Sequence, residues 1–119
     1  MEWYQLIKLE RSGEEIFAEA LINPDLSQYL GHFPDNPILP GFTQLEMVST
    51  AISKLRCESL LIKSLSRIKF RKLVRPGEKL AIYVIAAKKD QYQFKITNKG
   101  ENVCSGTLTL TPNFSTRTI

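Results

Sequence analysis

One segment limits the fold more than any other, because it has the periodicity of a helix and almost no charge. Apolar side chains recur between Phe42 and Leu55 at intervals of three and four residues, which is the spacing of one helix face. Glu46 is the only charged residue between Asn36 and Ser53. Since the outer face of a surface helix carries charged side chains, this segment is expected to be covered on most sides.

Most of the remaining sequence has the alternation or the apolar runs that are typical of β-strands. Two predicted strands, residues 3–9 and 16–22, precede the helix, and four predicted strands follow it between residues 65 and 111. Residues 80–87 are apolar on both faces, which predicts a central strand. An antiparallel sheet curled around one helix would bury that helix, so the sequence predicts an α+β fold.

The chain has 119 residues, which is the length of one domain, and residues 112–119 are expected to form a flexible tail. No apolar run is long enough to cross a membrane, and the first residues lack the pattern of a signal peptide, which favours a cytoplasmic protein. A net charge of +4 is too small to indicate a nucleic-acid-binding protein. One histidine and two distant cysteines, Cys57 and Cys104, predict neither a metal site nor a disulfide.

The single histidine, His32, stands in a proline-rich segment directly before the helix. Pro34, Pro37 and Pro40 recur at every third residue, which predicts a stiff, extended arm. Histidine titrates near neutral pH and suits proton transfer, whereas a carboxylate such as Glu46 in an apolar helix is costly unless it is paired, neutralised or used. Together they indicate acid–base chemistry. The alternatives are a structural histidine, an ordinary glutamate on the helix surface, and a proline-rich ligand for an aromatic groove.

The order His-Phe-Pro-x-x-Pro-x-x-Pro-Gly, with a glutamate fourteen residues after the histidine, resembles the FabZ-like β-hydroxyacyl-acyl-carrier-protein dehydratases. A second block, residues 68–78, resembles the next strand and turn of that family, and the order of elements agrees over residues 14–111. The resemblance implies a hotdog fold, in which an antiparallel sheet wraps around one long central helix, with residues 1–119 as a single domain.

The resemblance also implies the roles of individual residues. His32 matches the base that removes a proton from C2 of the acyl chain, and Glu46 matches the carboxylate that assists departure of the C3 hydroxyl. Gly41 matches the glycine whose N–H binds the thioester carbonyl, a role that suits the unpaired N–H groups at the start of a helix. Phe33 and Phe42 flank these positions, and we expect them to line the acyl channel.

The substrate that the resemblance implies is a (3R)-hydroxyacyl thioester, carried on the phosphopantetheine of an acyl carrier protein or on CoA, and the product is a trans-2-enoyl thioester. It implies no metal and no organic cofactor. It also implies a homodimer in which the histidine and the glutamate of one site come from different subunits, with a trimer of dimers as an alternative.

Several basic residues lie together on and after the strand predicted at residues 65–71. They are Arg67, Lys69, Arg71 and Lys72. A surface of this kind suits docking of an acidic carrier protein. The alternative is a solvated outer face whose charges prevent pairing of a sheet edge.

This chain departs from the family pattern in ways that affect the expected pathway. Asp35 follows His-Phe-Pro where many members have glycine, Thr50 stands where glutamine is common, and the chain is short. These departures favour a specialised pathway, such as aryl polyene or polyketide assembly, over general fatty-acid synthesis. Glu46 in place of aspartate argues against the related dehydratase/isomerase branch. A hotdog acyl thioesterase and a non-catalytic, carrier-binding subunit of a dehydratase complex remain as alternative functions.

Overall fold

The computed structural model describes residues 2–25 and 39–113. The predicted order of two strands, one helix and four strands is confirmed. The elements are β1 (Tyr4–Ser12), β2 (Glu15–Ile22), α2 (Gly41–Arg56), β3 (Leu60–Phe70), β4 (Lys79–Lys88), β5 (Gln91–Asn98) and β6 (Glu101–Pro112).

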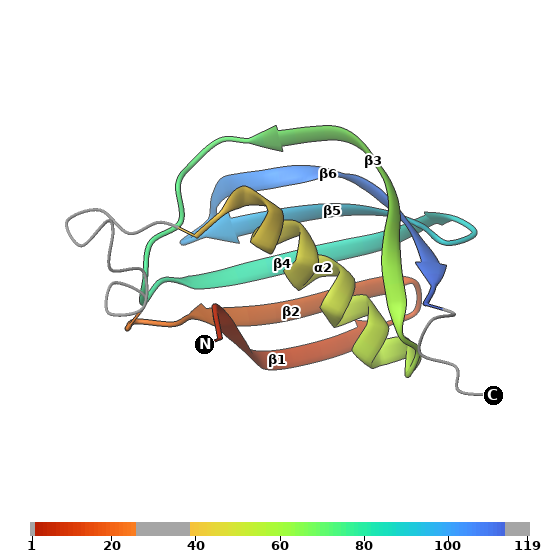
Figure 1. Cartoon of the computed structure of the whole chain (residues 1–119), viewed down its shortest axis with the longest axis horizontal. Helices are drawn as coiled ribbons and strands as arrows, with labels where there is room; N and C mark the ends of the chain where they lie inside the picture. The colour runs from red at the N-terminus through yellow and green to blue at the C-terminus, as the bar shows by residue number, and fades with distance from the viewer. Residues whose placement is uncertain (1, 26–38, 114–119) are drawn as a thin grey trace.

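All six strands form one antiparallel sheet in the order β1-β2-β4-β5-β6-β3. The sheet curves around α2, which crosses one of its faces and contacts β1, β2 and β3 (Figure 1). β4 lies between β2 and β5, so the prediction of a central strand at residues 80–87 is confirmed. The α+β architecture with a sheet wrapped around one helix is confirmed as well.

The core lies between α2 and the inner face of the sheet. Met47, Val48 and Ile52 of α2 are fully buried, and so are Ile82 and Ile96 of the central strands. Burial of each such side chain stabilises the fold by roughly 1.5–3 kcal/mol relative to exposure. Of the apolar side chains that the helical periodicity predicts on one face, Leu45, Val48 and Ile52 are therefore buried, whereas Phe42 at the start of the helix is exposed.

β3 is an edge strand with an irregular ladder. Its pairing with β6 shifts between Ser66 and Lys69, and Arg67 within the shift has a positive φ of 56°. At this bulge the Ile68 side chain packs directly against Gly106 of β6. A Cβ atom added at Gly106 would collide with Cδ1 of Ile68. Gly106 is therefore needed for close packing of β3 on β6.

The structure modifies two expectations at the ends of segments. β3 begins at Leu60 rather than at Leu65, and β6 extends to Pro112, the first residue of the expected tail. The proline-rich arm up to residue 38 and residues 114–119 lie outside the described residues.

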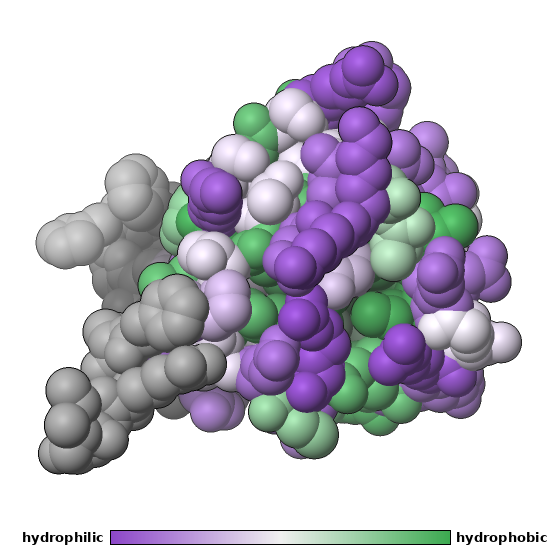
Figure 2. All heavy atoms as spheres, turned by 90° about the vertical axis from the view of Figure 1, so that its right-hand side faces the viewer, coloured by the Kyte–Doolittle hydropathy of each residue, from purple (hydrophilic) through white to green (hydrophobic). Residues whose placement is uncertain are grey.

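Within the described ranges, no helix is both long enough and apolar enough to span a membrane. The end of the molecule with the β1–β2 and β4–β5 turns is largely hydrophilic (Figure 2).

Candidate active site

The start of α2 is the part of the helix that the resemblance marks for substrate binding. Gly41 is its first residue, and Pro40 precedes it without a side chain that caps the helix. The entry is fixed from outside by the Leu39 N–H, which donates a hydrogen bond of 2.8 Å to the carbonyl oxygen of Val74. No acidic side chain lies in the first turn. The first N–H groups and the positive end of the helix dipole are therefore available to a ligand oxygen.

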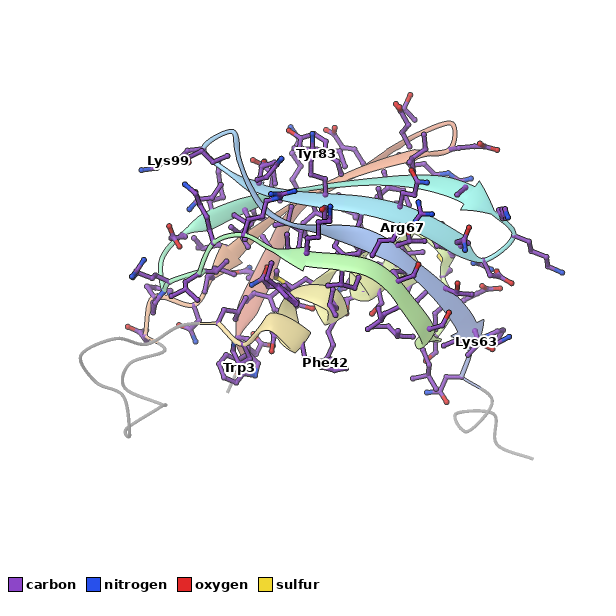
Figure 3. The ribbon with its side chains drawn as sticks, turned by 90° about the horizontal axis from the view of Figure 1, so that it is seen from above. Trp3, Phe42, Lys63, Arg67, Tyr83 and Lys99 are labelled. Carbon is purple, nitrogen blue, oxygen red and sulfur yellow. The ribbon has the colours of Figure 1, made fainter. Side chains whose placement is uncertain are left out.

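Glu46 lies on the exposed side of α2, one turn after Phe42. Phe42 is 60% exposed and points away from the sheet (Figure 3). Thr50 and Ser53, on the same side of the helix, are only half-buried. The expected cover on most sides therefore does not extend to this side, which the described part of the chain leaves open. The physical reason is that one curved sheet covers one face of a helix, and the described part of the chain places no cover on the opposite face, which carries Phe42, Glu46 and Thr50.

Phe70, at the end of β3, packs its ring against the start of α2. A Cβ atom added at Gly41 would lie 3.0 Å from Cζ and 3.1 Å from Cε1 of Phe70, so a side chain at this position would have to displace the ring. The Phe70 side chain is nevertheless 51% exposed. Gly41, Phe42 and Phe70 form what we call the helix-start patch. Phe70 stands in the strand predicted at residues 65–71, and only the fold reveals its contact with Gly41.

Gln44 is a second residue that sequence analysis misses. Its side chain is almost completely buried on the sheet side of α2, in the first turn after Gly41. Its Oε1 atom has no hydrogen-bond donor among the described residues. A buried carboxamide oxygen without a donor is costly, so this atom is a ready acceptor for water or for a polar group beneath the helix start.

The structure describes some of the candidate residues and not others. Gly41, Phe42 and Glu46 come together within the first turns of α2. His32 and Phe33 lie outside the described residues, and their roles stay predictions. Within residues 2–25 and 39–113, the candidate site therefore consists of an open helix start, an exposed carboxylate and an exposed aromatic patch.

The basic residues on and after β3 are exposed, and they fall into two groups. Arg67, Lys69 and Arg71 have no carboxylate within salt-bridge distance in the described part of the chain. Lys72 instead pairs with Glu101, and its hydrogen bond holds the pKa of the Glu101 carboxyl below its ordinary value. The charge of Lys72 is therefore partly balanced within the chain.

Residues 8–107 match the model of the ApeI-like family, which is described as ApeI dehydratase. A curated relative is the 3-hydroxyacyl-[acyl-carrier-protein] dehydratase FabZ of Oenococcus oeni. It is 31% identical over 88% of this chain and 87% of its own length. The family match runs from within β1 to within β6, so it extends over the candidate site and most of the sheet that supports it.

Solved structures agree with this sequence similarity. A chain of the dehydratase heterocomplex ApeI:P from Xenorhabdus doucetiae superposes with a TM-score of 0.76 and 25% identity, over 92% of this chain and 98% of that chain. A mutant of the fluoroacetyl-CoA-specific thioesterase FlK has a TM-score of 0.63 at 12% identity, over 87% of this chain and 89% of that chain, and shares the fold alone. The chain thus has the hotdog fold and belongs to the ApeI-like dehydratase family.

Proposed function

We propose that this protein is a hydro-lyase that dehydrates (3R)-hydroxyacyl thioesters on acyl carrier protein to trans-2-enoyl thioesters. The observation that carries the proposal is the position of Glu46 on α2, close to the uncapped helix start at Gly41. Family membership supports the reaction class, since the FabZ relative is named for dehydration of 3-hydroxyacyl groups on the carrier protein. The departures from the FabZ pattern at Asp35 and Thr50 favour a specialised aryl polyene or polyketide pathway.

In the proposed mechanism, His32 takes the proton from C2 of the acyl chain. The electron pair left at C2 forms the C2=C3 double bond as the bond between C3 and its oxygen breaks. Glu46 gives a proton to the departing hydroxyl, which leaves as water, and the proton on His32 returns to Glu46 through solvent before the next turnover. The Gly41 N–H donates a hydrogen bond to the thioester oxygen, where negative charge gathers. These steps need no metal or organic cofactor, because phosphopantetheine belongs to the substrate.

We propose a homodimer as the working form, because one chain leaves the candidate site open. Among the described strands, β3 pairs only with β6, so its other edge is unpaired. Leu61, Leu65 and Phe70 on β3 are exposed large apolar residues, as is Phe42 on α2. A second copy at this edge would cover apolar area that is costly to leave in water. It would also enclose Glu46 and the helix-start patch, as acid catalysis in a dry site requires.

An experiment on product identity tests the proposed reaction. The purified protein is incubated with a 3-hydroxyacyl thioester on carrier protein, at several chain lengths, and the products are followed by mass spectrometry. We expect the substrate to lose one water with the wild type and none with His32→Ala or Glu46→Gln. Release of free thiol instead would show the acyl thioesterase that the fold also permits.

Carrier docking is a separate proposal that rests on three exposed cations on and just after β3, Arg67, Lys69 and Arg71, which have no carboxylate partner in the described part of the chain. Charge reversal in Lys69→Glu/Arg71→Glu is expected to lower activity on the carrier-bound substrate far more than on a short pantetheine thioester. Lys88→Glu/Lys89→Glu, near the β4–β5 turn, is the matched control with the same change in charge. Equal losses on both substrates would contradict docking at β3.

A second candidate function is that of a subunit within a larger dehydratase assembly. It is favoured by the similarity to a chain of a structure named as a dehydratase heterocomplex. In this case the protein alone would bind acyl carrier protein without converting the substrate, and activity would appear only after addition of a partner dehydratase subunit. The same assay, run with and without that subunit, separates the two candidates.

A further inference from the structure

The outer face of the sheet, opposite α2, carries an aromatic and apolar cluster without a cover. Tyr83 and Ile85 of β4 are 45% and 44% exposed, and Tyr83 projects from the side of the sheet opposite Phe42 (Figure 3). Phe17 of β2 pairs with Tyr83 in the ladder, and their ring centroids lie 5.2 Å apart. These side chains line a groove that runs over β2, β4 and β5. Tyr83 and Ile85 on the outer side of β4 explain why the sequence of this strand is apolar on both faces.

Charged side chains flank this cluster in the same cross-strand row. Glu10 of β1 pairs with Phe17, and Lys95 of β5 pairs with Tyr83, so the row across four adjacent strands is Glu10, Phe17, Tyr83, Lys95. The Nζ atom of Lys95 lies 5.5 Å from the centroid of the Tyr83 ring. No carboxylate lies within salt-bridge distance of Lys95 in residues 2–25 and 39–113.

The two halves of this face differ in charge. β1 and β2 place Glu10, Glu15 and Glu19 on it with one lysine, Lys8, which lies 3.6 Å from Glu10. β4 and β5 contain no aspartate or glutamate, and they place Lys79 and Lys95 there. Lys79 pairs with Glu19 at 3.4 Å within the chain. The β1–β2 half is therefore acidic, the β4–β5 half is basic, and the aromatic pair lies on the boundary between them.

We propose that this face binds the same face of a second copy of the chain, back to back, through a two-fold axis that runs parallel to the strands between β2 and β4. Such an axis lays β1 of one copy over β5 of the other and β2 over β4. Glu10 of each copy then faces Lys95 of its mate, and Phe17 of each faces Tyr83 of its mate. Aligned packing of two sheet faces about 10 Å apart is a common arrangement.

The charge pattern favours a second copy of the chain as the binding partner, and it also favours a two-fold axis parallel to the strands. An isologous interface needs a surface that is complementary to itself, and the row from Glu10 to Lys95 meets that condition under this axis. A two-fold axis perpendicular to the strands would instead oppose Glu10 to Glu10 and Lys95 to Lys95. The surface is also separate from the proposed dimer edge, since β3 lies at the far end of the sheet from β1. Both contacts can therefore form at once.

Charge-reversed variants that are mixed with each other test the proposal. Glu10→Lys and Lys95→Glu each place like charges opposite one another at both ends of the interface, so each alone is expected to associate at least about tenfold more weakly. In sedimentation equilibrium, the wild type should then have twice the mass of either variant, whether or not the β3 edge also pairs. An equimolar mixture of the two variants restores opposite charges at both ends and should recover the wild-type mass.

Glu14→Lys mixed with Lys89→Glu is the matched control, since it changes charge equally in two turns away from the row. Neither control variant should lose mass. Circular dichroism and thermal unfolding of every variant verify the fold. Single variants with the same mass as the wild type would overturn the proposal, and so would a mixture that stays at half of the wild-type mass.

Discussion

The two ends of α2 differ in how many hydrogen bonds and ion pairs the chain's own side chains supply to them. At the C-terminal end, Arg56 reaches Glu58 at 2.7 Å, Asp90 at 3.2 Å and the Tyr92 hydroxyl at 2.9 Å. Burial by itself would lower the pKa of Arg56, but the hydrogen bonds to Tyr92 and Asp90 outweigh it and leave that pKa above its ordinary value. Cys57 closes the helix in the left-handed conformation. We call this the closed end.

The N-terminal end has none of these contacts within the described chain. No side chain caps it, Phe42 and Glu46 are exposed, and half of Phe70 faces solvent. We call this the open end. The same helix is thus fixed by the chain's own side chains at one end, while its other end presents unpaired N–H groups, a carboxylate and aromatic rings. In the proposed function, the closed end supplies rigidity and the open end serves substrate and subunit contact.

The largest expected effect is at the open end. Glu46→Gln removes the proposed proton donor but keeps the shape of the side chain, so the rate should fall by about 10²–10⁴. The side chain is exposed in one chain, so the free energy of unfolding should change by less than about 0.5 kcal/mol. Turnover of the acyl thioester and urea unfolding check both parts. Glu14→Gln, an exposed glutamate in a turn, is the control, and a rate near that of the wild type would remove Glu46 from the mechanism.

A smaller loss is expected when the helix start is filled. Gly41→Ala places a Cβ atom 3.0 Å from the Phe70 ring, which must shift together with any ligand held there. We expect kcat/KM to fall on the order of tenfold, because small displacements in an active site weaken its transition-state contacts. Adding Phe70→Leu should recover part of the loss, and Phe70→Leu alone is the control. Full activity of Gly41→Ala would separate Gly41 from substrate binding.

The closed end should respond in the opposite way. Arg56→Met keeps the stem of the side chain but removes three polar contacts, and we expect it to lower the free energy of unfolding by about 1–2 kcal/mol. Activity per folded molecule should stay unchanged, because no candidate residue lies at this end. Urea unfolding and turnover are measured together, with Lys54→Met in the same turn as control. A large loss of activity without a loss of stability would contradict the division between the two ends.

The smallest effect concerns the two thiols, which probe how tightly each end is packed. Cys57 at the closed end is exposed, whereas Cys104 pairs with Phe70 in the ladder beneath the open end and is buried. Burial raises the pKa of the Cys104 thiol from 9.0 to about 11. Iodoacetamide at pH 8 should therefore modify Cys57 first and Cys104 only after unfolding, as mass spectrometry of the alkylated chain would show.

The same shift gives a sign for the dependence on pH. Between pH 9 and pH 11 the folded state keeps the Cys104 proton that the unfolded state loses. The contribution of this thiol to stability is therefore complete below pH 9 and falls as the pH rises. Early alkylation of Cys104 in the folded protein would contradict a tightly packed core beneath the open end.

The sequence predicts much of this fold because helix and strand periods are local signals. The helix between Phe42 and Leu55 and the central position of residues 80–87 follow from such patterns. The start of β3 at Leu60 does not, because it depends on pairing with Pro112 of β6, far along the chain. Strand order depends on similar distant pairings.

The candidate site follows from the sequence only in part. The motif identifies Gly41 and Glu46, but a charge-free helix surface has the same appearance whether its own chain or a second copy covers it. The exposure of Glu46 could therefore not be predicted. The contact of Phe70 with Gly41 and the isolated oxygen of Gln44 also require the fold, because each joins groups that no local pattern relates.

The most direct test of the account asks whether a second chain completes the open end. His32→Ala and Glu46→Gln, each inactive alone, are co-expressed with different affinity tags, and the mixed dimer is isolated by two purification steps. If each site combines His32 of one subunit with Glu46 of the other, one site in the mixed dimer is intact, and we expect about half of the wild-type activity per dimer. A mixed dimer as inactive as its parents would contradict a site shared between two chains.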